Sequence, residues 1–129
     1  MTQSALNKGR ELVADIDPEL EAVLKERYDD MLPDFAESLV EIAYGRVYSR
    51  PGLDMKTRLI ATIAALTAQG GQTTPQLKVN IKNALTIGVT QREISEVIFQ
   101  MSLYGGLPAT INALNAAKEV FQQHAENET

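Results

Sequence analysis

The chain contains no cysteine, no tryptophan and a single histidine among its 129 residues. Without cysteine there are no disulfides, no thiolate metal ligands and no thiol redox chemistry. One histidine excludes the common zinc sites, and it also excludes a Cys–His or Ser–His–Asp arrangement built around a core histidine. We expect this residue, His124, to be a solvated surface side chain, because it lies in a polar C-terminal segment. The sequence therefore predicts no metal site.

Long apolar runs and an excess of positive charge are missing too. No apolar stretch approaches the about 18 residues of a membrane-spanning helix, and residues 1–20 lack the apolar core of a signal peptide. We therefore expect a soluble, cytoplasmic protein. The net charge of −5 argues against nucleic acid as the main partner. To bind an anion, such a chain must concentrate its positive charges locally, as it does at Arg46, Arg50, Lys56 and Arg58.

Aromatic residues make up only 5% of the chain, whereas 44% is hydrophobic, so the core must be aliphatic and rich in alanine. No segment shows the sustained alternation of a half-buried strand, and apolar residues recur instead at helical spacing. We predict an all-α fold of six to seven helices in a compact bundle, with short loops between antiparallel neighbours. A single domain over 1–129 is expected, with a frayed polar tail from about residue 122.

The N-terminal part predicts three helices. Residues 4–14 contain Gly9, so the first helix should be short and weak. The Asp17-Pro18 pair predicts the start of the second. A third should open at Pro33-Asp34 and stop before Arg50-Pro51, because proline disfavours helix in the residue before it.

Capping signals define the later helices more sharply. Asp54 predicts the start of a long helix over 55–69. A second helix over 75–87 begins at a Thr-Pro pair, and Gly88 is placed to end it in the left-handed conformation.

A capping box formed by Thr90 and Glu93 is the clearest local signal, and it predicts a helix over 91–104. Pro108 then starts the last helix. The predicted inward face of that helix consists of Ile111, Leu114, Ala117 and Phe121.

Arg58 lies one turn into the helix predicted over 55–69, on the side of small residues rather than of the aliphatic stripe. A guanidinium binds a carboxylate bidentately and stays charged, so Arg58 is a candidate for binding an acid. A surface position, or an ion pair with a neighbouring helix, is the alternative.

Asn80 lies on the predicted inward face of the next helix, between Leu77 and Ala84. A buried amide without a partner costs on the order of a few kcal/mol, so Asn80 should have a defined partner or line a cavity. A cap or a helix–helix hydrogen bond is the alternative.

Tyrosine and arginine gather just before Pro51, as Tyr44, Arg46 and Tyr48. These residue types can form a wall for a small planar anion, and they are equally typical of an oligomer contact. Near the start of the last helix, Asn112 and Asn115 add two amides, for which capping or solvent-facing roles are the alternatives.

Three longer segments carry a resemblance to a known family. They are GRVYSRPGLDMKTR, the run from Lys-x-Asn-x-Lys-Asn-Ala-Leu to Gly-Val-Thr-x-x-Glu-Ile, and LYGGLPATINAL. Together they resemble the γ-carboxymuconolactone decarboxylase family over roughly residues 10–121. The resemblance implies an all-α fold of the alkyl hydroperoxidase D type. It also implies a homo-oligomer, since such proteins usually form hexamers built as trimers of dimers.

Two chemistries are implied by this resemblance. Members similar to alkyl hydroperoxidase D use a Cys-x-x-Cys pair, whereas this chain has Thr73 and Gln76 near those positions, which excludes thiol peroxidase activity. Members of the other branch are carboxy-lyases of aromatic catabolism that need no cofactor. Their GLD-x-x-TR segment is matched with Arg58, and their Tyr-x-Gly-x-Pro-Ala segment with Tyr104, for which a core position is the alternative.

The chain also departs from the pattern of that branch. Asn80 corresponds to the pocket histidine of the family, and Asn112 and Asn115 correspond to histidines of the last helix. An amide can orient a carbonyl or hydroxyl, but it cannot shuttle a proton near neutral pH. The aromatic segment, in which the decarboxylase usually has Trp and Glu, reads here with Tyr44, Arg46 and Tyr48.

We therefore expect a cofactor-independent decarboxylase of a small carboxylated lactone. In the catalytic pair, Arg58 binds a carboxylate or polarises the carbonyl, and Asn80 donates to the developing enolate. Two alternatives stay open: a different small-acid enzyme, such as an isomerase or lactone hydrolase, and a family fold that binds a small molecule without converting it. The predicted substrate-binding residues are Tyr44, Arg46, Tyr48, Tyr104 and Asn112.

Overall fold

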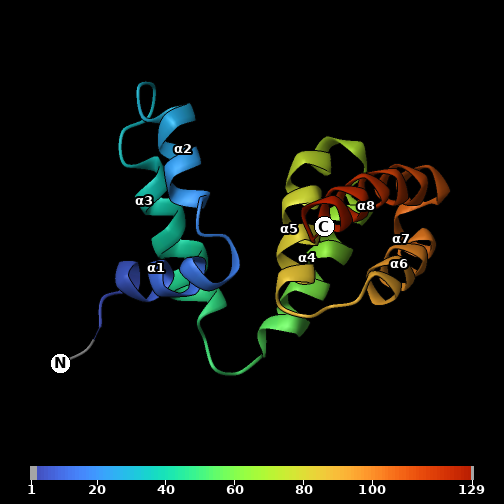
Figure 1. The fold of residues 1–129 in the computed structure, drawn as a ribbon, viewed down its shortest axis with the longest axis horizontal. Helices are drawn as coiled ribbons and strands as arrows, with labels where there is room; N and C mark the ends of the chain where they lie inside the picture. The colour runs from blue at the N-terminus through green and yellow to red at the C-terminus, as the bar shows by residue number, and fades with distance from the viewer. Residues whose placement is uncertain (1–2, 129) are drawn as a thin grey trace. The chain divides into compact units, whose positions relative to one another are not determined.

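A computed structural model describes residues 3–128, and within them every regular element is helical, as predicted. The chain divides after Leu53 into two compact units (Figure 1). Counting contiguous elements together, the described residues form seven helical segments. In this count α3 runs directly into η1, η2 runs directly into α5, and Met101 alone separates α6 from α7, whereas Gly106, with a φ of 92°, breaks the helix between α7 and α8. None of the described helices is both long and apolar enough to span a membrane.

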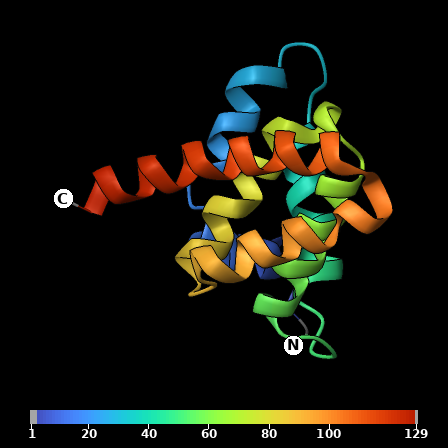
Figure 2. The same ribbon diagram turned by 90° about the vertical axis from the view of Figure 1, so that its right-hand side faces the viewer.

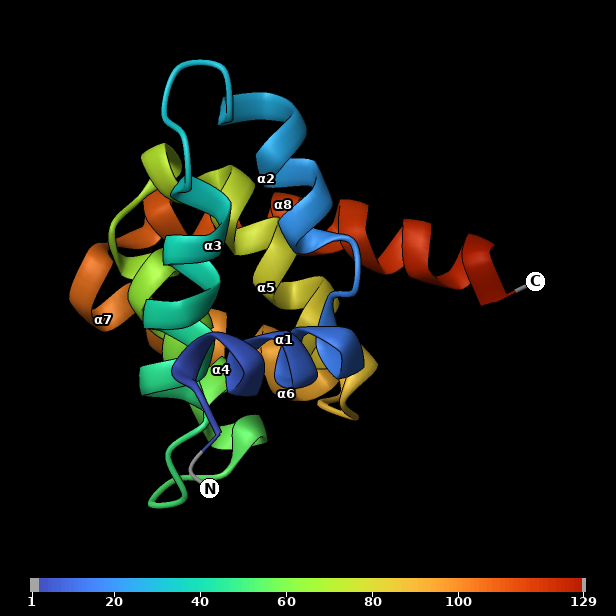
Figure 3. The same ribbon diagram turned by 90° about the vertical axis from the view of Figure 1, so that its left-hand side faces the viewer.

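The first unit contains three α-helices and one π-helix. In Figure 3, α2 lies beside α3, and α1 crosses the helix η1 that continues α3. The elements are α1 (Ala5–Ile16), α2 (Leu20–Tyr28), α3 (Phe35–Leu39) and the π-helix η1 (Val40–Tyr48). The third predicted helix is therefore present, but most of its length has π geometry.

Two buried glycines let α1 and η1 cross with their backbones in contact. A Cβ atom on Gly45 would lie 1.9 Å from the carbonyl oxygen of Ala5. A Cβ on Gly9 would lie 2.5 Å from the carbonyl oxygen of Val40. Gly9, which weakens the helix predicted from the sequence, is therefore the residue that permits this packing.

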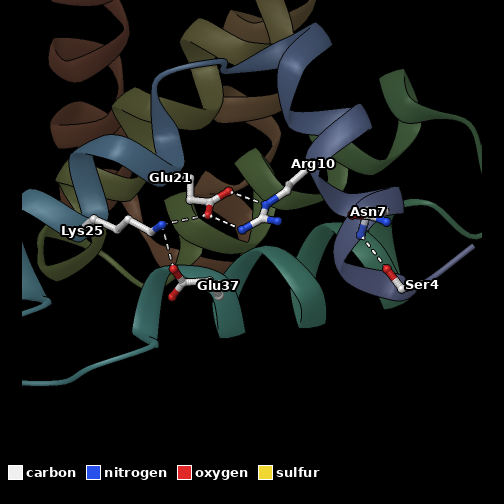
Figure 4. Close-up of polar contacts among 6 residues, drawn as sticks. All are labelled: Ser4, Asn7, Arg10, Glu21, Lys25 and Glu37. Atoms are coloured by element: carbon white, nitrogen blue, oxygen red, sulfur yellow. Dashed lines mark hydrogen bonds and ion pairs between the residues drawn. The ribbon is translucent and has the colours of Figure 1, made fainter.

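A chain of ion pairs ties α1, α2 and α3 together (Figure 4). The guanidinium of Arg10 donates to both carboxylate oxygens of Glu21, at 3.0 and 2.9 Å. The ammonium of Lys25 lies 3.5 Å from Glu21 and 2.8 Å from Glu37. Hydrogen bonds from Arg10 lower the pKa of Glu21, and those from Lys25 lower the pKa of Glu37.

The second unit contains the remaining elements. Its α4 and α5 run side by side in opposite directions, and α8 crosses α5 (Figures 1 and 2). Helix α6 packs against both α4 and α8. The elements are α4 (Met55–Ala68), the 3-10 turn η2 (Gly71–Thr73), α5 (Thr74–Thr86), α6 (Gln91–Gln100), α7 (Ser102–Gly105) and α8 (Leu107–Glu128).

Three predicted capping signals of this unit are confirmed, whereas Thr74 is the first residue of α5 and not its cap. The side chain of Asp54 accepts from the backbone N–H of Thr57 at 2.8 Å, at the start of α4. Thr90 and Glu93 exchange the two hydrogen bonds of the capping box, at 2.9 and 3.0 Å. Gly88 has a φ of 99° and ends α5 in the left-handed region.

The predicted inward face of the last helix is wrong for two of its residues. Ile111 is 56% exposed and Leu114 is 38% exposed. The helix instead turns a face of small residues inward, which lets it approach α5 closely. The helix is also continuous to Glu128, beyond the predicted start of the frayed tail, whereas α6 ends four residues earlier than predicted. The buried residues of α8 are Thr110, Ala113, Ala116, Ala117 and Val120.

Replacing Gly45 with alanine should destabilise the first unit by about 2 to 3 kcal/mol, because the new methyl group must push α1 away from η1. Urea unfolding followed by circular dichroism measures this change. The control is Gly52→Ala, where the new Cβ meets nothing within 4 Å and the expected change is within about 0.5 kcal/mol. Equal stability of the two variants would contradict the close crossing.

Replacing Glu21 with glutamine should lower the thermal midpoint at pH 7 but have little effect in acid. The folded-state pKa of Glu21 lies below its ordinary value of 4.5, so its contribution is complete above pH 4.5 and is lost as the pH falls through the folded pKa. Thermal unfolding of both proteins between pH 3 and 7 tests this. The control is Glu19→Gln, since Glu19 is exposed and takes no part in the ion pairs above. A difference from wild type that stays constant with pH would contradict the prediction.

Candidate functional site

The α4–α5 hairpin carries both predicted catalytic residues. Arg58 lies in the first turn of α4 and is half-buried. Its backbone N–H donates to the carbonyl of the capping residue Asp54 at 3.0 Å. Asn80 lies halfway along α5 and is also half-buried. Because the two helices are antiparallel neighbours, both residues belong to one packed layer.

The amide of Asn80 is held by its own helix. Its Nδ2 donates to the backbone carbonyl of Gln76 at 2.8 Å. This bond lies within α5, so it is neither the cap nor the helix–helix hydrogen bond considered for Asn80. The carbonyl oxygen and the second N–H of the amide are the groups with which it could bind a ligand.

Tyr104 and Asn112 gather near the turn that joins the two helices. A Cβ on Gly105, the neighbour of Tyr104, would lie 2.9 Å from the Cα of Ala68 at the end of α4. A Cβ on Gly71 would lie 3.6 Å from the amide nitrogen of Asn112. Tyr104 is 74% exposed, so the core position considered for it is wrong, and Asn112 is exposed as well.

Arg58 lies at the other end of the hairpin from these two residues. Ten residues of helix separate it from Ala68, which corresponds to about 15 Å along the axis. The structure therefore brings Tyr104 and Asn112 to the turn end and Arg58 to the open end, with Asn80 between them. Asn115 is exposed on α8.

The three remaining predicted residues belong to the first unit and lie on η1. Tyr44 is buried, and burial raises its pKa to about 12. Its ring meets that of Tyr48 edge to face, with centroids 5.4 Å apart. Arg46 is exposed and pairs with Glu41 at 3.2 Å. A π-helix is rare and often occurs at functional sites, which suits the predicted role of this segment in binding.

Sequence reasoning missed Asn83. This residue is 1% exposed, and neither its Nδ2 nor its Oδ1 has a hydrogen-bond partner among residues 3–128. With Gln76 and Asn80 it forms a polar stripe at positions i, i+4 and i+7 of α5. That spacing is visible in the sequence and could have revealed the residue.

A shallow groove of about 410 Å³ lies between α6 and α8 and contains none of the predicted residues. Within the described part of the chain, no group of three or more acidic or histidine side chains is placed to hold a metal ion. The residues that line the groove include Gln91, Ser95, Leu114, Lys118 and Phe121.

The sequence pattern of the carboxymuconolactone decarboxylase family matches residues 33–119. The chain belongs to this family. The match extends across the boundary at Leu53, so both units contribute to the family pattern.

Relatives of this family member include two named decarboxylases. A 4-carboxymuconolactone decarboxylase from Acinetobacter baylyi is 40% identical over 97 residues, covering 75% of this chain and 71% of the relative. A nitrosuccinic acid decarboxylase from Metarhizium robertsii is 35% identical over 78 residues, covering 60% of this chain and 53% of the relative. An uncharacterized 15.0 kDa protein from Paracoccus denitrificans is 40% identical over 124 residues, covering 96% and 92%.

In this member of the carboxymuconolactone decarboxylase family, the α4–α5 layer supplies the guanidinium-bearing residue Arg58 and a stripe of amides. A guanidinium can hold a carboxylate in a fixed orientation. Amide N–H groups can stabilise negative charge that develops on an oxygen atom. The layer therefore has the groups to bind a small acid and to stabilise an enolate, but no imidazole to move a proton.

Proposed function

We propose that this chain is a cofactor-independent decarboxylase of a small carboxylated lactone of aromatic catabolism, or of a closely related small acid. The observation that carries the proposal is the placement of Arg58 and Asn80 on adjacent antiparallel helices, both half-buried. Family membership supports the reaction type, and so do two relatives that are named as decarboxylases of small acids.

The reaction needs an electron sink rather than a cofactor. The bond to the departing carboxyl carbon breaks, CO₂ leaves, and the electron pair is delocalised through the conjugated lactone onto its carbonyl oxygen. Arg58 binds a carboxylate of the substrate or polarises that carbonyl, and Asn80 donates to the developing enolate oxygen. Protonation of the enolate by water or a tyrosine then gives the enol-lactone.

A non-catalytic role has one specific observation in its favour. The amide nitrogen of Asn80 already donates to Gln76, and an amide cannot take the place of an imidazole as proton carrier near pH 7. A protein that binds the acid without converting it is therefore the second candidate, and product analysis separates the two.

Removal of Arg58 should abolish most of the turnover of 4-carboxymuconolactone. We expect Arg58→Ala and Asn80→Leu each to lower kcat/KM about 100-fold or more while leaving the circular dichroism spectrum unchanged. CO₂ release and enol-lactone formation are the measured quantities.

The control for Arg58 is Arg92→Ala, because Arg92 is exposed on α6 and pairs with its helical neighbour Glu96 at 2.8 Å. Unchanged turnover in Asn80→Leu would contradict the role of the amide. Binding without product in the wild-type protein would favour the non-catalytic candidate.

We also propose that the chain assembles as a homo-oligomer, with a hexamer built as a trimer of dimers as the expected form. Large apolar side chains are exposed on each of α6, α7 and α8, and large exposed apolar areas are typical of an interface. They are Phe99 (63%), Leu103 (78%), Leu107 (61%) and Ile111 (56%).

Replacing Leu103 with glutamate should reduce the mass of the assembly, because a charge would be buried in the interface. Size-exclusion chromatography with light scattering measures that mass. The matched control is Met31→Glu in the first unit, since both side chains are 78% exposed. A wild-type protein with the mass of one chain would contradict the proposal.

A further inference from the structure

The polar stripe of α5 turns away from α8. Lys78 of α5 forms an ion pair with Glu119 of α8, which fixes the side of α5 that faces this neighbour. Asn80 and Asn83 are rotated by about 140° or more from Lys78 around the helix. The elements that pack most extensively on α5 are α4, α8 and η2, and we infer from this that the flank lies on the α4 side of the helix.

Asn83 lies at the same end of the hairpin as Arg58. It occupies the last turn of α5, whereas Arg58 occupies the first turn of α4. In an antiparallel pair these two turns are level with each other. Asn80 lies one turn further along the same stripe, with about 5 to 6 Å between the Cβ atoms of residues so spaced. Arg58 and Asn83 therefore lie at the same end of the α4–α5 layer, and Asn80 lies one turn further toward its middle.

Burial of the Asn83 amide lowers the stability of the protein when no ligand is bound. Its nitrogen and oxygen are both buried without a partner among the described residues. An unpaired buried amide loses its hydrogen bonds to water and gains nothing in return, so leucine, whose side chain branches at the same atom, would be more stable there. Polar groups that are kept at such a cost are typical of binding and catalytic sites.

We propose that Asn83 is a further substrate-binding residue, whose amide completes its hydrogen bonds with a carboxylate or carbonyl oxygen of the small acid. The inference rests on the proposed function and deepens it. The acid reaches the amide by displacing the side chains that cover it in the free protein. In this proposal Arg58 binds a carboxylate of the acid, and the buried amide of Asn83 fixes the position of the acid.

Thr67 offers a matched control. Its hydroxyl is also buried without a partner among the described residues, and the residue is 1% exposed. It lies in the last turn of α4, nine residues and about 14 Å of helix away from Arg58. Thr67→Val and Asn83→Leu therefore each relieve an unpaired buried group, but only Asn83 lies at the Arg58 end.

The probe is the ring-saturated analogue of 4-carboxymuconolactone, which keeps both carboxylates and the lactone carbonyl but lacks the ring double bond conjugated with that carbonyl. Calorimetric titration of the full-length protein gives its Kd, and thermal unfolding gives Tm. We expect Asn83→Leu to raise Tm by a few degrees and to weaken binding at least tenfold. Thr67→Val should raise Tm as well and leave Kd within twofold of wild type. Asn83→Ala is the second variant if leucine does not pack, with the same loss of binding.

Binding of the analogue by Asn83→Leu as tightly as by wild type would overturn the assignment of Asn83 alone. Equal weakening in Thr67→Val would overturn it too, because the loss would then follow from changed packing between the helices and not from the position of the amide. Absence of binding by the wild-type protein would overturn the proposed function, and the assignment of Asn83 with it.

Discussion

The antiparallel contact between α4 and α5 is the constraint on which the second unit depends. It buries the aliphatic side chains of both helices, among them Leu59, Ile63 and Ile81, which are at most 1% exposed. The same contact sets Arg58 and the amide stripe of α5 in one layer. The same two helices therefore carry the core and the candidate site, so a change in how they pack would also move the residues of the site.

Backbone signals in the sequence predicted the second unit well. Asp54, Thr90 with Glu93, and Gly88 act through bonds or dihedral angles within a few residues, so their effect is decided locally. Long-range packing was harder to predict. The apolar residues of α8 suggested an inward face that includes Ile111, whereas the close approach to α5 selects alanines, and the sequence alone does not show which partner a helix meets.

Long-range packing was equally hard to predict in the first unit. Gly9 lowers helix propensity, yet it is needed where α1 crosses η1, and this contact joins segments far apart in the chain. The candidate site was predicted only in part for a related reason. Arg58 and Asn80 were found through residue type and resemblance, whereas Asn83 became visible only when its burial and its lack of a partner were known.

A decarboxylase can work without an imidazole if the substrate carries its own electron sink and the protein supplies charge and donors in fixed positions. The central claim is that the α4–α5 layer holds the acid in this way. A crystal structure of the protein with the ring-saturated lactone dicarboxylate tests it most directly. The account predicts a carboxylate against the guanidinium of Arg58 and an oxygen of the ligand within hydrogen-bond distance of Asn80. A ligand found in the groove between α6 and α8, with the Arg58 end unchanged, would contradict it.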